Sequence, residues 1–200
     1  MKSFSGQICS ASTTACTGHE LLRPAHAISK GLIVLSVVWF LFAAITLASA
    51  VVDVASYRIP NALVLLLMVL FFIVAALHWR EVDWLSHLGA LALVLGAGVF
   101  FYSFGQMGAG DVKLLAALAL WAGVYALIPL LFWVSLCGLL AMLVILLLRR
   151  ALPVLQARGA MSAGPLPRVL RRGEGVPYGI GIAPGALVAS LSFPMWLWQL

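Results

Sequence analysis

Charged residues are scarce in this sequence: they make up 9% of its 200 residues, and only six residues are acidic. A soluble globular domain has roughly 25% charged residues, so this scarcity excludes an ordinary soluble domain. Hydrophobic residues make up 64% of the chain, which is typical of a protein embedded in a lipid bilayer. The composition therefore predicts an all-α polytopic membrane protein.

Cysteine is also scarce, with three residues whose spacing does not resemble a zinc site, so neither a metal nor a cofactor is expected. Cys137 lies in an apolar stretch and is interpreted as a packing residue. Cys9 and Cys16 lie in a polar segment, where they either form a disulfide or remain free thiols. Both alternatives stay open.

Long apolar runs divide the chain into candidate membrane crossings. A spanning helix needs roughly 20 mostly apolar residues, and six such windows are bounded by charge, Pro or Gly. The windows are approximately 31–52, 61–78, 85–104, 112–127, 129–148 and 178–198. The fourth and fifth lie nearly end to end, and together they could form one kinked segment. We favour two helices, because about 37 residues of straight helix would be about 55 Å long and would overshoot the hydrocarbon.

The windows predict a single membrane domain, residues 30–200, with about six transmembrane helices. Residues 1–29 form a polar extension, rich in Ser and Thr and without the apolar core of a signal peptide. Residues 149–177 form a basic loop that we expect to be irregular and exposed. Part of its charge is expected to rest against anionic lipid headgroups.

The net charge of +6 is concentrated in one place, which argues against a nucleic-acid partner. Half of the twelve cationic residues lie in the basic loop: Arg149, Arg150, Arg158, Arg168, Arg171 and Arg172. Basic loops mark the cytoplasmic side of a membrane. With six crossings, the 53–60 and 105–111 loops share that side, and both termini lie opposite. The sequence thus predicts a multi-pass membrane protein with its basic loop on the cytoplasmic side.

Two of the six acidic residues stand at the ends of apolar windows. Asp53 ends the first window and Asp111 begins the fourth, and the two windows between them run out and back across the membrane. Counting crossings therefore places both carboxyls at the same membrane face. Each residue also has a purely structural interpretation: Asp111 as a helix N-cap, and Asp53 as a partner of Arg58 or a marker of the membrane boundary.

Two carboxyls that meet at the rim of a low-dielectric site tend to share one proton. The ionised member can then activate a water molecule while the protonated member polarises a peptide carbonyl, which is the chemistry of aspartic proteases. A helix N-terminus favours an anion and a C-terminus favours a neutral acid. The helix ends therefore predict Asp111 as the base and Asp53 as the acid.

The neighbours of Asp111 have two interpretations each. Gly108 and Gly110 either leave the backbone open for an extended peptide substrate or form a tight loop with no ligand. Lys113 is two positions from Asp111 and so points to a different face of the helix. Its ammonium is expected to reach the lipid headgroups or an acidic group of a substrate.

Four segments in this order resemble one known family. They are Asp53, "RIPN" at 58–61, "GAGDVKLL" at 108–115 and "VPYGIGIAPGAL" at 176–187. Together they resemble the type IV prepilin peptidases, which are intramembrane aspartic proteases with a GxGD motif. The resemblance runs from about residue 31 to the C-terminus, and it leaves out the polar extension.

The resemblance implies that the protein removes the short basic leader from prepilins at the cytoplasmic face of the inner membrane. Asp53 and Asp111 occupy the positions of the family's catalytic aspartates. The predicted substrate contacts come from the motifs around them: Pro60, Asn61, Gly108, Gly110, Lys113, Pro177 and Tyr178. For Pro177 and Tyr178 the alternative is that they merely start the sixth helix.

Larger members of the family carry a domain with paired CxxC motifs and also methylate the new amino terminus. This chain contains no such motif, so it resembles the short, peptidase-only form of tight-adherence (Flp-type) pilus systems. Two alternatives remain. One is a non-enzymatic transporter or secretion-assembly subunit in which Asp53 and Asp111 form an ion or proton path. The other is a related GxGD protease that cuts other single-span proteins, such as archaeal preflagellins.

Overall fold

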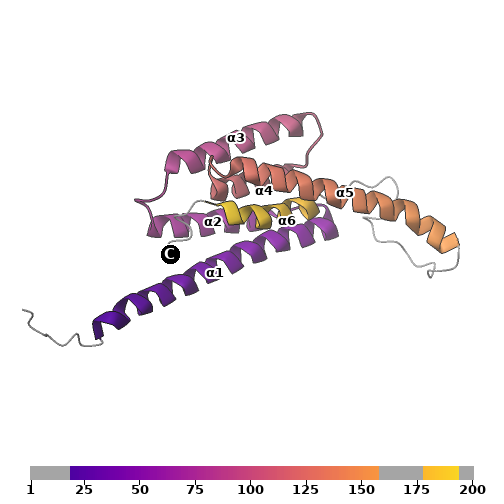
Figure 1. Cartoon of the computed structure of the whole chain (residues 1–200). Coiled ribbons are helices and arrows are strands. Elements are labelled where there is room, and N and C mark those ends of the chain that lie inside the picture. Colours follow the sequence, from indigo (N-terminus) through magenta and orange to yellow (C-terminus); the bar gives the residue numbers. More distant parts are fainter. Residues whose placement is uncertain (1–18, 158–177, 194–200) are drawn as a thin grey trace, which may run out of the picture.

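The computed structural model describes residues 19–157 and 178–193, and this part of the chain is helical with short connecting turns. In chain order the elements are α1 (His19–Ser56), α2 (Asn61–Leu77), α3 (Trp84–Ser103), α4 (Ala109–Ala122), α5 (Leu127–Ala157), α6 (Gly179–Ala189) and the 3-10 turn η2 (Ser190–Ser192). The helices form a bundle from which α1 and α5 project at opposite ends (Figure 1). Each of the six apolar windows overlaps mainly with one helix, so the predicted all-α class is confirmed.

Three of these helices are long and apolar enough to cross a membrane. Within the described residues, the candidate spans are Ser36–Ser56, Trp84–Ser103 and Leu127–Leu152. The apolar helices α2 and α6 are shorter, and the 14 residues of α4 extend only about 21 Å. The fold is that of a membrane protein, and the number of six crossings stays a prediction.

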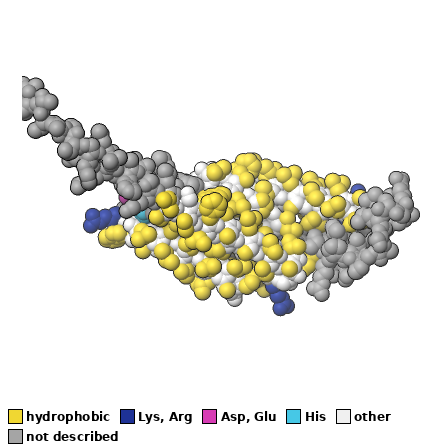
Figure 2. Space-filling view, turned by 90° about the horizontal axis from the view of Figure 1, so that it is seen from below, with side chains coloured by type: hydrophobic (Ala, Val, Ile, Leu, Met, Phe, Trp, Pro, Cys, Tyr) yellow, Lys and Arg dark blue, Asp and Glu magenta, His cyan; other side chains and the backbone are white. Residues whose placement is uncertain are grey.

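The outer surface of the bundle is hydrophobic. Figure 2 shows hydrophobic side chains spread over the whole described part of one face, with a few Lys and Arg side chains at its margins. Large apolar side chains such as Leu85 and Ile128 are 86% and 78% exposed. A soluble protein rarely exposes a continuous apolar surface of this extent, whereas lipid chains would cover it at no cost.

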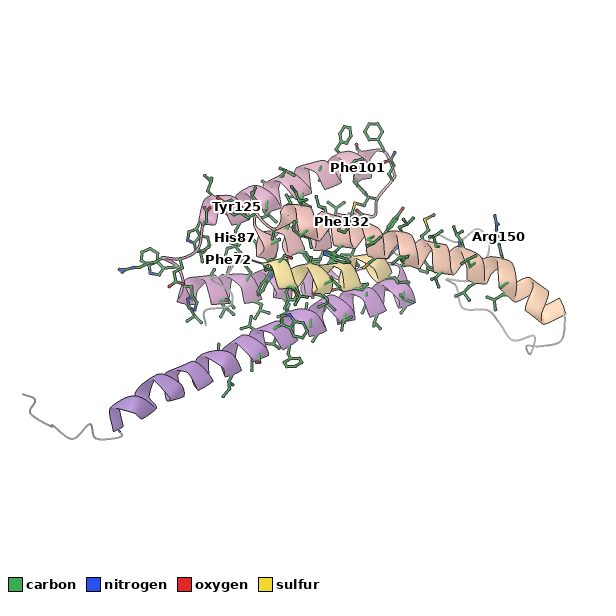
Figure 3. All side chains as sticks on the ribbon, viewed as in Figure 1. Phe72, His87, Phe101, Tyr125, Phe132 and Arg150 are labelled. Carbon is green, nitrogen blue, oxygen red and sulfur yellow. The ribbon has the colours of Figure 1, made fainter. Side chains whose placement is uncertain are left out.

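Helix α4 is the buried centre of the bundle. Val112, Leu114 and every residue from 116 to 122 are buried, as expected for a helix that is apolar on all sides. The Trp121 indole N–H donates to the Leu67 carbonyl of α2 at 3.1 Å. The His87 ring of α3 hydrogen bonds through Nδ1 to the Leu120 carbonyl at 2.7 Å, and it points into the bundle in Figure 3. These bonds fix α4 between α2 and α3.

The chain breaks between α4 and α5, so the prediction of two helices there is confirmed. The break lies at Gly123, whose φ of +65° is in the left-handed region, rather than at Pro129. Pro129 lies in the first turn of α5, where its missing N–H leaves no hydrogen bond unmade.

Two predicted boundaries differ from the structure. Helix α5 continues to Ala157, so residues 149–157 of the predicted irregular loop are helical. Helix α1 begins at His19, so residues 19–29 of the predicted polar extension are also helical. In both places the helix extends past the apolar window, because charged and polar residues do not by themselves end a helix. Cys9, Cys16 and residues 158–177 lie outside the described residues.

Helices α5 and α6 approach each other closely, because small residues face the contact. A side chain at Gly181 would collide with the Cα and backbone N of Gly138. A side chain at Gly185 would lie 2.5 Å from the Cα of Val134. These two glycines set how near α6 lies to α5, and α6 begins beside Asp53.

We expect Gly181→Ala to destabilise the protein, because the new methyl group must push two backbones apart. Overpacking of this kind costs about 1–3 kcal/mol. Gly138→Ala is the matched control: it sits across the same contact, but a Cβ there would meet nothing within 4 Å. Unfolding midpoints in detergent should therefore fall for Gly181→Ala alone, and equal midpoints for the two variants would contradict this packing.

Candidate active site

The last turn of α1 carries Asp53, which is 5% exposed. The helix ends three residues later at Ser56, and Tyr57 then adopts a left-handed conformation with φ of 54°. The Tyr57 N–H still donates to the Asp53 carbonyl at 2.7 Å. Pro60 follows as the N-cap of α2, with the φ of −62° that its ring imposes. The chain therefore turns sharply beside Asp53.

Asp111 is the third residue of α4, whose N-cap is Gly108. The interpretation of Asp111 as the N-cap is therefore wrong. Its carboxyl folds back toward the backbone of Gly108. A Cβ at Gly108 would lie 2.7 Å from Asp111 Oδ2, so only glycine leaves room for this arrangement.

Gly110 lies against Ile59 rather than beside an open space for a peptide substrate. A Cβ at Gly110 would lie 3.2 Å from Cβ of Ile59 and 3.4 Å from its backbone N. The space beside Gly110 is thus filled by the turn after α1 rather than left open for a peptide. The missing side chain brings that turn, and Asp53 with it, close to the start of α4.

The two aspartates line one cavity of about 330 Å³. Its walls come from the turn after α1 and from the start of α4, and the other lining residues are Tyr57, Arg58, Ile59, Asn61, Gly108, Ala109, Gly110 and Lys113. The structure thus brings Asp53 and Asp111 to one cavity, and their role as a catalytic pair stays a prediction. Within residues 19–157 and 178–193, no ion pair joins Asp53 to Arg58.

The two carboxyls have unlike surroundings. The Gly179 N–H, at the start of α6, donates to Asp53 Oδ2 at 2.8 Å, which holds this oxygen as an acceptor. Asp111 is 7% exposed, and its Oδ1 has no hydrogen-bond partner among the described residues. Asp111 lies outside the three candidate membrane spans. Burial, and then the nearby charge of Asp53, raises the pKa of the Asp111 carboxyl to about 6.

These surroundings favour Asp111 as the protonated member of the pair and Asp53 as the acceptor. This is the reverse of the prediction from the helix ends. The helix dipole alone favours an anion at Asp111, but that argument left out the Gly179 N–H that Asp53 accepts and the missing partner of Asp111 Oδ1.

The remaining predicted residues lie around the cavity or away from it. Lys113 donates through Nζ to Asn61 Oδ1 at 3.1 Å, across the exposed rim between α4 and α2. Tyr178 is 54% exposed and precedes α6, and it lines a different cavity. Pro177 lies outside the described residues.

That second cavity, of about 590 Å³, is largely apolar and adjoins the glycine loop of Asp111. Gln106 and Met107, which directly precede Gly108, line it together with side chains of α5 and α6. Phe101, near the end of α3, also lines it and is labelled in Figure 3. The cavity with the two carboxyls and this larger apolar cavity thus adjoin one loop, residues 106–111.

Two residues of the site were missed by the sequence analysis. Gly179 belongs to the "VPYGIGIAPGAL" segment, yet nothing in the sequence indicates that its N–H reaches a carboxylate 126 positions earlier. Tyr57 lies between Asp53 and the "RIPN" segment, and its place in that short turn was the available signal. Both were missed because their roles depend on backbone atoms or on an unusual backbone conformation.

The comparison with known proteins gives a family for this arrangement. The profile of the type IV leader peptidase family matches residues 39–143, just over half of the chain and including both aspartates. The chain belongs to the type IV leader peptidase family. This membership indicates a peptidase with prepilin-type substrates. No curated protein and no solved structure gives a significant match. Helix α6 and Gly179 lie beyond the residues that the family profile matches.

Proposed function

We propose that this protein is an aspartic endopeptidase that removes the short basic leader from Flp-type prepilins at the cytoplasmic face of the inner membrane. The observation that carries the proposal is the pair of buried carboxyls, Asp53 and Asp111, in one cavity at the ends of two helices. A peptidase of this family needs a group that takes a proton from water and another that gives one to the substrate. The unlike surroundings of the two aspartates suit these two tasks.

In the proposed reaction, a water molecule lies between the two carboxyls and attacks the peptide carbonyl carbon. Asp53 takes a proton from the water as the C–O bond forms, and Asp111 gives its proton to the carbonyl oxygen. The tetrahedral intermediate then collapses: the C–N bond breaks, the leaving nitrogen takes the proton from Asp53, and Asp111 recovers a proton from the hydroxyl. Water is consumed and both carboxyls return to their starting states.

The substrate must lie extended where it is cut, because a helical peptide hides its carbonyls. A prepilin has a basic leader followed by an apolar helix, so its cleavage site rests at the membrane boundary. The apolar cavity beside Met107 would receive the apolar part of the prepilin. Lys113 and Asn61 at the rim, with the neighbouring Pro60 and Gly108, would border the extended segment. Tyr178 would line the apolar cavity that receives the rest of the prepilin.

The proposal is tested by coexpression with a candidate Flp-type prepilin. We expect loss of the leader, seen as a mobility shift and as a new amino terminus by mass spectrometry. Cells that carry an empty vector should retain the full prepilin. If the protein accumulates in the membrane and no Flp-type prepilin is cut, the proposal is wrong, and the alternative of an ion or proton path through Asp53 and Asp111 gains support.

The cleavage rate is expected to fall as the pH rises above about 6. Asp111 must hold a proton to give it to the carbonyl oxygen, and this proton is lost as the pH rises through the pKa of the Asp111 carboxyl, about 6. A bound peptide displaces water and shifts the fall to higher pH. Because the two carboxyls interact, the observed midpoint belongs to the pair.

Initial rates of prepilin cleavage between pH 5 and pH 9 measure this midpoint. A rate that rises through pH 6 and does not fall by pH 9 would contradict the assignment, because it would make Asp111 the base. The stability of the protein over the same range is the control, measured as the unfolding midpoint at each pH.

A further inference from the structure

Two buried side-chain oxygens in the described part of the chain have no hydrogen-bond partner: Asp111 Oδ1 and the hydroxyl of Tyr57. Both residues line the cavity of about 330 Å³ that holds the two aspartates. Burying a polar group without a partner costs stability, so most such groups in proteins are paired. Two unpaired groups in one cavity indicate that their partner is a molecule that enters it.

The backbone of Tyr57 carries a second cost. Its φ of 54° is the one positive value at a residue other than glycine in the described part of the chain. The left-handed conformation is unfavourable for a bulky side chain, and glycine would adopt it without strain. Strained backbones that persist in a fold gather at functional sites. Glycine would avoid the strain at this position, yet the chain carries a tyrosine there, and its phenol lines the cavity that holds Asp53.

The surrounding turn holds Tyr57 in this conformation. Its N–H donates to the Asp53 carbonyl, and the neighbouring Ser56 hydroxyl donates to the Val52 carbonyl at 2.7 Å. Ile59, two residues after Tyr57, is buried against Gly110. Tyr57 is thus fixed on one side by the end of the helix that carries Asp53, and on the other by the contact with the start of α4.

We propose that the Tyr57 hydroxyl donates a hydrogen bond to the carbonyl oxygen of the peptide bond that is cut. This inference rests on the proposed function. The carbonyl oxygen has two lone pairs, so it can accept from Tyr57 and from protonated Asp111 at the same time. As water attacks, charge develops on this oxygen and the hydrogen bond from Tyr57 strengthens. Tyr57 keeps its proton throughout, and the proton transfers remain those of the two aspartates.

The test is Tyr57→Phe in the full-length purified protein, assayed on a full-length Flp-type prepilin. The variant loses the hydroxyl and keeps the ring and the strained backbone. We expect kcat to fall about 100-fold, with KM within about twofold, because the hydrogen bond acts mainly in the transition state. The unfolding midpoint should stay equal or rise, because an unpaired buried hydroxyl has been removed.

Tyr125→Phe is the matched control. Tyr125 is 82% exposed in the turn between α4 and α5, at the opposite end of the bundle from Phe101 (Figure 3). The kcat of Tyr125→Phe should equal that of the wild type. A kcat for Tyr57→Phe within twofold of wild type would overturn the inference. A lower kcat accompanied by a lower unfolding midpoint would also overturn it, because the hydroxyl would then be structural.

The same assay separates this inference from the proposed function. Asp53→Asn and Asp111→Asn are measured beside the tyrosine variants. Inactive aspartate variants with a fully active Tyr57→Phe would remove the inference and leave the proposed function standing. Active aspartate variants would overturn the proposed function, and the inference would fall with it.

Discussion

Replacing Gly179 with alanine is expected to lower the rate of leader cleavage about 100-fold. The Gly179 N–H donates to Asp53 Oδ2, and a Cβ at this position would lie 2.8 Å from that oxygen and 2.9 Å from Asp53 Cβ. Carbon atoms in folded proteins do not approach so closely, so either the carboxyl or the start of α6 must move. A displacement of about 1 Å at a catalytic group can cost about 100-fold in rate.

The matched control is Gly96→Ala. Gly96 lies within α3, is exposed, and a Cβ there would meet nothing within 4 Å. Alanine also favours a helix more than glycine does, so this variant should fold and cleave like the wild type. The measurement is kcat on a purified prepilin, with the unfolding midpoint of each variant as a check on folding. If Gly179→Ala and Gly96→Ala cleave at the same rate, the contact between α6 and Asp53 plays no part in catalysis.

This prediction depends on a contact that the sequence could not show. The helix positions followed from the apolar windows, because a segment that lies in hydrocarbon must satisfy its own backbone hydrogen bonds. The separation of α4 from α5 was also predictable, because a single helix over both windows would be longer than the hydrocarbon is thick. The contact between Gly179 and Asp53 joins a backbone N–H to a side chain across 126 positions, and no periodicity encodes such a contact.

The site was predictable where it depended on topology. Counting crossings was enough to bring Asp53 and Asp111 to one end of the bundle, and the cavity that they share confirms this. The division of labour between them was not predictable in the same way. A helix dipole can be read from the position of a residue in a helix, whereas burial and the charge of a neighbour depend on the packed structure.

The glycines show the same limit. The sequence indicated that Gly108 and Gly110 remove side chains beside Asp111, which is correct. It did not indicate what takes the freed space. At Gly108 the space admits the carboxyl of Asp111 itself, and at Gly110 it admits Ile59. Gly110 therefore brings the two halves of the site together, whereas Gly108 lets the Asp111 carboxyl fold back over the start of its own helix.

The largest effect is expected for the aspartates themselves. Asp53→Asn and Asp111→Asn should each lower kcat about 1,000-fold or more, because general acid–base groups contribute roughly 100-fold to 10,000-fold and neither function can be replaced by the partner carboxyl. Asparagine fills the same space as aspartate, so the cavity should keep its shape. It cannot take a proton from water at Asp53, and it cannot give one as an acid at Asp111.

Asp83→Asn is the control, because it makes the same substitution outside the cavity. Asp83 is the N-cap of α3 and accepts from the Ser86 N–H at 3.2 Å. Asparagine caps a helix about as well as aspartate, so both stability and cleavage should be preserved. The control separates loss of a carboxylate in the cavity from loss of a carboxylate in general.

The most direct measurement is the single-turnover cleavage of a full-length Flp-type prepilin by the purified proteins in lipid nanodiscs, with the products identified by mass spectrometry. The two-carboxyl site predicts complete leader removal by the wild type and by Asp83→Asn, and no more than about a thousandth of that rate for Asp53→Asn and for Asp111→Asn. A folded Asp53→Asn or Asp111→Asn protein that cleaves within about tenfold of the wild-type rate would contradict it.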